Sequence, residues 1–170
     1  MEDRVHGETL RIYLNDHLAL ARGAEELAER CREENHGTDL GRFLSAIAGG
    51  FRDDQEAIRE MLKAGRWREN AVKEAMAWLL EKAGRLKPND RLIGYSDLSR
   101  VEELQALVLA LQSMESFWDV LEVEEVATPA GLPVPSLVER REWAAQKRRE
   151  TAALCRAAAV KAFLRADPLP

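Results

Sequence analysis

The sequence is poor in the features that mark three large classes of protein. Lys and Arg number 25 against 30 Asp and Glu, a net charge of −5, so the chain lacks the basic excess of proteins that bind nucleic-acid phosphates. It has no apolar run of the roughly 18 residues needed to span a bilayer. Its first residues are too polar for a secretory signal. We therefore expect a cytoplasmic protein with neither nucleic acid nor membrane as a partner.

Reactive and metal-binding side chains are also scarce. The 170 residues include only three histidines and two cysteines, and they contain no Cys-x-x-Cys pair, phosphate-binding glycine loop or serine elbow. A chain of this length needs no disulfide in order to fold. Cys31 and Cys155 should lie toward the same end of the molecule, where they could approach each other, but we expect them to be small buried packing residues. Nucleotide hydrolysis and acyl transfer have no support in the sequence.

What the sequence has in abundance is the composition of helices. Ala, Leu, Glu and Arg are frequent, whereas Thr, Tyr and Ile are few, and this balance favours helix over strand. Apolar residues recur three and four positions apart in four long segments, which is the spacing of one helix face. The long helices are expected at about 8–34, 39–64, 97–127 and 136–165.

A long crossover separates the second and third of these helices. It spans residues 66–96, and a short extra helix is expected within it at about 69–83. Gly49 and Gly50 fall inside the second long helix, where we expect a kink or a close helix crossing. The chain is predicted to form one all-α domain, residues 1–170.

The lengths of the connections predict the topology. Short turns make the helices of each hairpin antiparallel neighbours, and the long crossover leaves the second and third long helices parallel. This is the topology of the ferritin-like up-down four-helix bundle. Three short strings carry a more specific similarity: Tyr13–Ala19, Arg52-Asp53-Asp54 and Gly84–Lys87. The chain resembles ferritin-like four-helix proteins over nearly its whole length, and in these strings it is similar to uncharacterised bacterial members.

The resemblance implies a dimetal centre, but the chain departs from the ligand pattern of that centre. In the metal-binding members, two helices each give a Glu and two others each give a Glu-x-x-His pair. Here the histidines are His6, His17 and His36, and none lies in the second, third or fourth long helix. The one Glu-x-x-His string, Glu33 to His36, falls beside the first turn. We therefore expect no metal and no cofactor, with iron or manganese as the alternative.

A few polar residues interrupt the inward faces of the helices at one level. His17 lies about as far before the first turn as Asp54 lies after it, so at 1.5 Å per residue they should stand within about 3 Å of the same height. Glu115 on the third long helix falls at a comparable height, as does Arg148 on the last, or Arg141 lower on the same helix. These residues are predicted to form a central polar layer.

This layer has three interpretations. It can be structural and fix the helix register, with His17 donating to Asp54 and Arg148 bridging Glu115. It can be a pocket for a small molecule, or the remnant of a metal site in which His17, Asp54 and Glu115 bind the ion. It can be catalytic, because a histidine beside a carboxylate can act as a general base. The sequence favours a non-enzymatic binding or interaction protein that forms homo-oligomers. An oxidoreductase-like metalloprotein is the alternative.

Overall fold

The computed structural model describes residues 2–69, 96–123 and 134–164. These residues form four α-helices and, within the described ranges, no strand. The prediction of an all-α fold with four long helices is confirmed. The helices are α1 (Glu2–Glu34), α2 (Asp39–Ala64), α4 (Asp97–Leu121) and α6 (Val134–Phe163).

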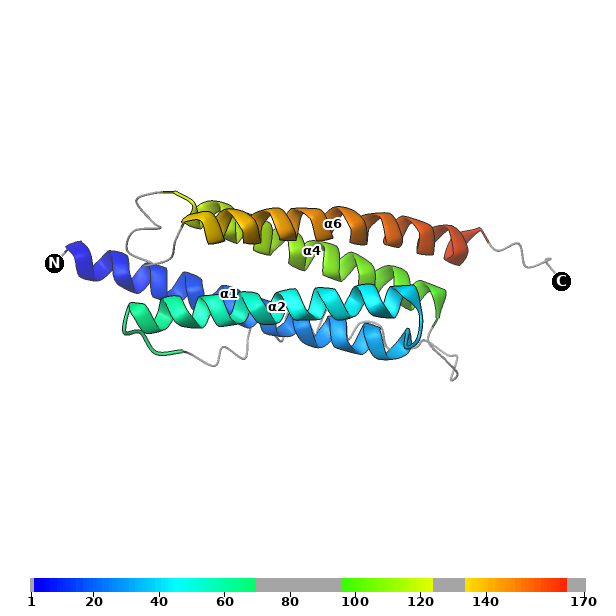
Figure 1. Ribbon diagram of the computed structural model, residues 1–170, viewed down its shortest axis with the longest axis horizontal. Coiled ribbons are helices and arrows are strands. Elements are labelled where there is room, and N and C mark those ends of the chain that lie inside the picture. Colours follow the sequence, from blue (N-terminus) through cyan, green and yellow to red (C-terminus); the bar gives the residue numbers. More distant parts are fainter. Residues whose placement is uncertain (1, 70–95, 124–133, 165–170) are drawn as a thin grey trace.

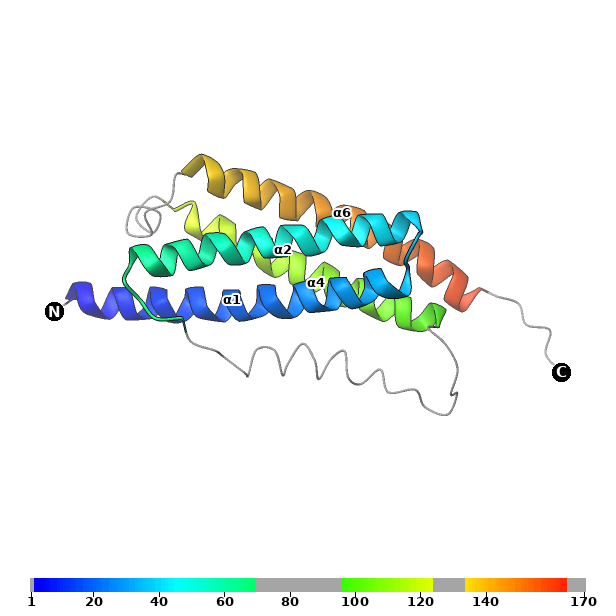
Figure 2. The ribbon, with the colours of Figure 1, turned by 60° about the horizontal axis from the view of Figure 1, so that its bottom comes forward.

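The four helices lie side by side as two antiparallel hairpins. α1 and α2 form one hairpin and α4 and α6 the other, and α1 packs against α4 to join them (Figures 1 and 2). α2 and α4 run in the same direction along the bundle, as do α1 and α6 (Figures 1 and 2). This orientation is the one expected where a long connection carries the chain back along the bundle between α2 and α4.

The helix boundaries agree with the spacing for α2 and differ at the ends of the other three helices. α6 runs from Val134 to Phe163, two residues earlier at each end than expected. α1 begins six residues earlier than expected, at Glu2. α4 ends at Leu121 rather than near 127, because the backbone N–H of Glu122 bonds to Asp119 O as well as to Trp118 O and tightens the last turn. The short helix expected at about 69–83 lies outside the described residues, apart from its first residue.

The turn between α1 and α2 is held by side-chain caps. Thr38 Oγ1 accepts from the backbone N–H of Gly41 at 3.1 Å and donates to the carbonyl oxygen of Asn35 at 2.7 Å. Gly37 takes a φ of 75°, a conformation that side chains disfavour. A Cβ on Gly41 would overlap with the carbonyl oxygen of Asn35. The tight first hairpin therefore depends on glycine at two positions.

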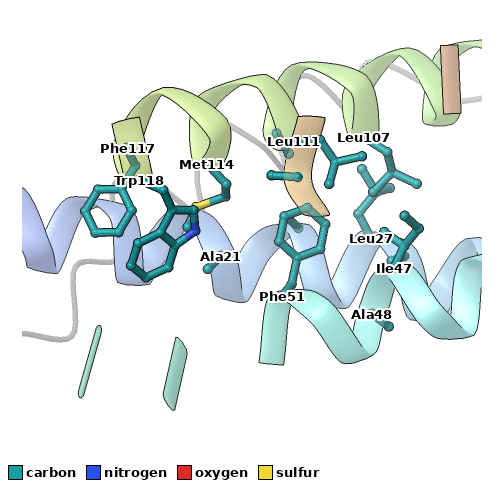
Figure 3. Packing of buried hydrophobic residues seen from close by; sticks show 14 of the residues in the cluster. Ala21, Leu27, Ile47, Ala48, Phe51, Leu107, Leu111, Met114, Phe117 and Trp118 are labelled. Atoms are coloured by element: carbon teal, nitrogen blue, oxygen red, sulfur yellow. The ribbon is translucent and has the colours of Figure 1, made fainter. Parts of the chain in front are cut away.

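The core runs along the bundle as one apolar cluster to which all four helices contribute (Figure 3). Its largest fully buried side chains include Trp118, Phe51, Phe117, Leu14, Leu44 and Leu111. Two carboxylates, Asp54 and Glu103, are buried with this cluster. Buried charges are costly unless they are paired and hydrogen bonded, so these two positions are where the core departs from simple packing.

The outer surface is rich in charged side chains. Arg52 on α2 reaches Glu25 on α1 at 2.7 Å and Glu29 at 3.4 Å. Exposed pairs of this kind each contribute at most about 1 kcal/mol to stability. Over the described residues, none of the helices combines the length and the apolar character that crossing a membrane would require.

Candidate functional site

The predicted central polar layer is divided into separate pairs. Arg148 Nε donates to Glu115 Oε2 at 2.7 Å, and this pair bridges α6 and α4 as expected. Arg141 Nε pairs instead with Glu122 Oε1 at 2.5 Å, near the end of α4. Both pairs are partly exposed, so they tie the second hairpin together without forming a buried site.

The expected hydrogen bond between His17 and Asp54 is not formed, because His17 makes its hydrogen bond within α1. Its Nδ1 lies 2.9 Å from the carbonyl oxygen of Tyr13, and because a carbonyl can only accept, Nδ1 carries the proton. The imidazole stacks on Phe117 with the ring centroids 4.4 Å apart. Burial lowers the pKa of His17, which favours the neutral ring. His17 is thus a member of an aromatic cluster rather than the partner of a carboxylate.

Asp54 is the buried carboxylate on which the candidate site is built. Its side chain is 3% exposed, and Arg140 Nη1 donates to its Oδ1 at 3.3 Å. Its Oδ2 has no hydrogen-bond partner, and neither does the buried Nε1 of Trp118. The Trp118 indole nevertheless lowers the pKa of Asp54 and so favours its charged form. Burial, opposed mainly by the charge of Arg140, raises the pKa of Asp54 to about 7. The single arginine therefore compensates the buried charge only in part.

Arg140, which the predicted layer did not include, pairs with Asp54 because α6 turns a different face to the core. The predicted face passed through Arg141 and Arg148, whereas the fully buried positions of α6 are Leu137, Ala144 and Thr151. Arg140 lies one turn from both Leu137 and Ala144, so it points toward α2 at the edge of the core. Its guanidinium also lies over the Trp118 ring, 5.3 Å from the centroid.

A cleft of about 330 Å³ lies between α2 and the first turns of α6, and Asp54 and Arg140 belong to its lining. The other residues that α2 contributes are Gly50, Asp53 and Glu56. The other residues that α6 contributes are Ser136, Glu139 and Trp143. The volume falls at the lower end of the range of small-molecule sites. Sequence reasoning found Asp54 but none of the residues on the α6 side.

Gly50 shapes one wall of this cleft. A Cβ at this position would overlap with the outer ring atoms of Trp143, so the indole lies directly on the glycine backbone. At the neighbouring Gly49 a Cβ would meet nothing within 4 Å. α2 and α6 are not among the helix pairs in close contact, so Gly50 makes room for the Trp143 indole rather than for the close helix crossing that was expected.

The cleft is strongly negative. Asp53, Glu56 and Glu139 are exposed at its edge, and none of the three takes part in an ion pair among the described residues. With Asp54 they supply four carboxyl groups against the one guanidinium of Arg140. Such a concentration of one sign of charge attracts ligands of the opposite sign.

The raised pKa of Asp54 predicts how stability changes with pH. The folded chain holds this proton more tightly than the unfolded chain, so stability is highest below the ordinary aspartate value near 4 and falls as the pH rises to about 7. Asp54→Asn removes this dependence. We expect this substitution to raise the free energy of unfolding by about 2 kcal/mol at pH 8, a value that allows for the lost pair with Arg140. At pH 4 the free energy of unfolding should change little.

Urea unfolding at the two pH values measures this difference. Asp53→Asn is the matched control, because the neighbouring carboxylate is exposed and its substitution should leave the pH dependence unchanged. An Asp54→Asn protein that is less stable than the parent at pH 8 would show that the pair with Arg140 outweighs the burial of the charge.

A second buried carboxylate, Glu103, was missed by sequence reasoning. It is 6% exposed, lies 3.5 Å from Arg30 and has a buried Oε2 without a hydrogen-bond partner. Burial raises the pKa of the Cys31 thiol, so it stays protonated. The signal was present, because Glu103 begins a run of buried positions spaced four and three apart, continuing through Leu107 and Ala110. Cys31 and Cys155 are both free and buried.

The described residues contain no group of three or more His, Cys, Asp or Glu side chains arranged to hold a metal ion. The three residues of the alternative metal site have separate partners: Tyr13 for His17, Arg140 for Asp54 and Arg148 for Glu115. The polar groups that do converge are Asp54, Arg140 and the acidic residues of the cleft.

Comparison with known proteins assigns no family to the chain. No family model, no curated protein and no solved structure matches it. What the chain does is therefore inferred from its own residues, and the cleft between α2 and α6 is the place where burial, charge and volume coincide.

Proposed function

We propose that this chain is a non-enzymatic binding protein with a ferritin-like bundle topology, and that it takes up a small ligand in the cleft between α2 and α6. The shared direction of α2 and α4 supports the topology (Figure 2). The ligand set of a dimetal centre is not present in the sequence, which holds three histidines. Of the two carboxylates buried in the core, Asp54 and Glu103, Asp54 is the one that lines the cleft.

The observation that carries the proposal is that Asp54, a residue of the cleft lining, has a buried Oδ2 without a hydrogen-bond partner. An unpaired buried acceptor lowers the free energy of unfolding by about 1–3 kcal/mol, and by more when the acceptor is charged. Glu103 Oε2 is also buried without a partner, but of the two carboxylates only Asp54 lines the cleft, where a ligand that donates to it recovers the cost on binding. The buried charge of Asp54 thus lowers the stability of the free protein and favours the binding of a ligand that pairs with it.

Catalysis has less support than binding. A carboxyl group with a pKa of about 7 can take up and release a proton at neutral pH. However, the described lining residues include no cysteine, lysine or histidine, and a general acid or base alone defines no reaction. A metal-dependent oxidoreductase is the lesser candidate, and it predicts stoichiometric iron or manganese.

Thermal unfolding in the presence of a ligand panel tests the proposal. The panel consists of 1,4-diaminobutane, glutarate, glycerol phosphate and an uncharged polyol. At saturation, at least one class should raise the melting temperature of the protein by about 5 °C or more. Elemental analysis of the same preparation should find far less than one iron, manganese or zinc per chain.

Covalent blocking locates the effect. Ser136→Cys, labelled with a bulky maleimide, should abolish the stabilisation, whereas the labelled control Glu60→Cys, an exposed position outside the cleft, should retain it. Labelling is selective because Cys31 and Cys155 are buried. Stabilisation by no class, or stabilisation that survives the label at position 136, contradicts the proposal, and stoichiometric metal would favour the oxidoreductase.

A further inference from the structure

We propose that the ligand of the α2–α6 cleft is a small organic cation carrying one or two ammonium groups. This inference rests on the proposed function and adds the chemical class of the ligand. Three independent properties of the cleft support it: the uncompensated buried carboxylate of Asp54, the ring of free acidic residues around it, and the indole wall formed by Trp143.

The buried carboxylate calls for a donor that carries a positive charge. Arg140 Nη1 approaches Asp54 Oδ1 at 3.3 Å, which is long for a charge-assisted hydrogen bond, and Oδ2 has no partner. Arg140 is also engaged by the Trp118 ring, so its charge is shared. A second cation would compensate the part of the Asp54 charge that Arg140 does not.

The edge of the cleft selects against anions and extends the site for a second positive charge. Asp53 and Glu56 lie on the α2 side and Glu139 on the α6 side. Together with Asp54 and Arg140 they give the cleft a net charge of about −3 when all carboxylates are ionised. A monoanion or dianion would have to approach Arg140 through this field, whereas a diamine is drawn in by it.

The shape of the cleft favours an organic cation over a metal ion. Its volume of about 330 Å³ is many times that of an ion, and none of the described acidic residues are gathered closely enough to hold a metal. Trp143 adds an indole wall, held in place by the absence of a side chain at Gly50. Indole rings bind ammonium groups through cation–π attraction.

A second cleft of the same volume serves as an internal comparison. It lies near the α1–α2 turn and the C-terminal part of α6, and its charged lining residues are Arg100 and Lys161. The positive charges of this cleft do not attract a diamine. The proposal therefore predicts one site per chain.

Isothermal titration calorimetry with 1,4-diaminobutane at pH 8 tests the inference. We expect one site per chain, a dissociation constant that rises at least about tenfold in Asp54→Asn, and weaker binding at pH 6 because the raised pKa of Asp54 lets its carboxylate take up a proton there. Glu56→Gln should weaken binding about threefold, in line with the value of an exposed charge pair. The matched control Glu60→Gln, one turn further along α2 and outside the cleft, should bind like the parent.

The outcomes separate this inference from the proposed function. Binding of glutarate in place of the diamine, lost on labelling at position 136, would overturn the cationic class while supporting a ligand site. Equal weakening by Glu56→Gln and Glu60→Gln, or undiminished binding to Asp54→Asn, would reveal unspecific attraction to an acidic protein and overturn the inference. If no titrant binds, both the inference and the proposed function are contradicted.

Discussion

Trp118→Ala should lower the free energy of unfolding by about 3–5 kcal/mol, the usual cost of removing a large aromatic side chain from a core. Trp118 is fully buried, meets Phe117 edge to face with centroids 4.7 Å apart, and lies beneath the guanidinium of Arg140. Its loss opens a cavity in the apolar core, where its ring lies beside Phe117 and Met114 (Figure 3). Urea unfolding monitored by circular dichroism measures the effect.

Trp118→Phe is the matched control. It keeps a ring in the core and removes an indole N–H that has no hydrogen-bond partner, so it should cost less than about 1.5 kcal/mol. It should also raise the pKa of Asp54 further, because the indole favours the charged carboxylate. A phenylalanine variant as unstable as the alanine variant would mean that the N–H of Trp118 is hydrogen bonded in solution.

Gly41→Ala should lower the free energy of unfolding by about 3 kcal/mol, at the upper end of the usual cost of overpacking. The added Cβ would overlap with the carbonyl oxygen of Asn35. That oxygen also accepts from the backbone N–H and the hydroxyl of Thr38, so it cannot move without breaking the cap of α2. Equilibrium unfolding in guanidinium chloride measures the loss.

Gly49→Ala provides the control for the effect of glycine itself. It lies on the same helix, and its Cβ would meet nothing within 4 Å, so relief of the glycine penalty should raise stability by up to about 1 kcal/mol. The two Gly-to-Ala changes on α2 therefore have opposite signs. Equal unfolding midpoints for them would contradict the packing of the first turn described above.

The helices themselves could be predicted because the apolar spacing and the caps agree. Asp39–Ala64 was predicted to the residue, since Thr38 precedes an apolar stripe and Gly65 follows it. The end of α4 was predicted six residues too late, because the sequence does not show how Glu122 bonds to the last turn. The face of α6 was predicted wrongly, since alanines and charges are spread around this helix and leave its apolar side poorly marked.

The candidate site was predicted in part for the same reason. Asp54 stood out because it interrupts the clear apolar stripe of α2, and the structure places it in the core. Arg140 could not be identified without the rotation of α6, which is set by packing against α4 and not by local sequence. Trp143 could not be assigned to the site either, because its ring lies on Gly50, a contact between distant positions of the chain.

The contact between Gly50 and Trp143 limits how this sequence can diverge. An alanine at position 50 is compatible with the present backbone only if the indole moves or is replaced by a smaller side chain. A small residue at position 143 in turn frees position 50 from its requirement for glycine. In homologous chains that keep this cleft the two positions should therefore covary, and a pair that varies independently would identify chains in which the wall of the cleft has been rebuilt.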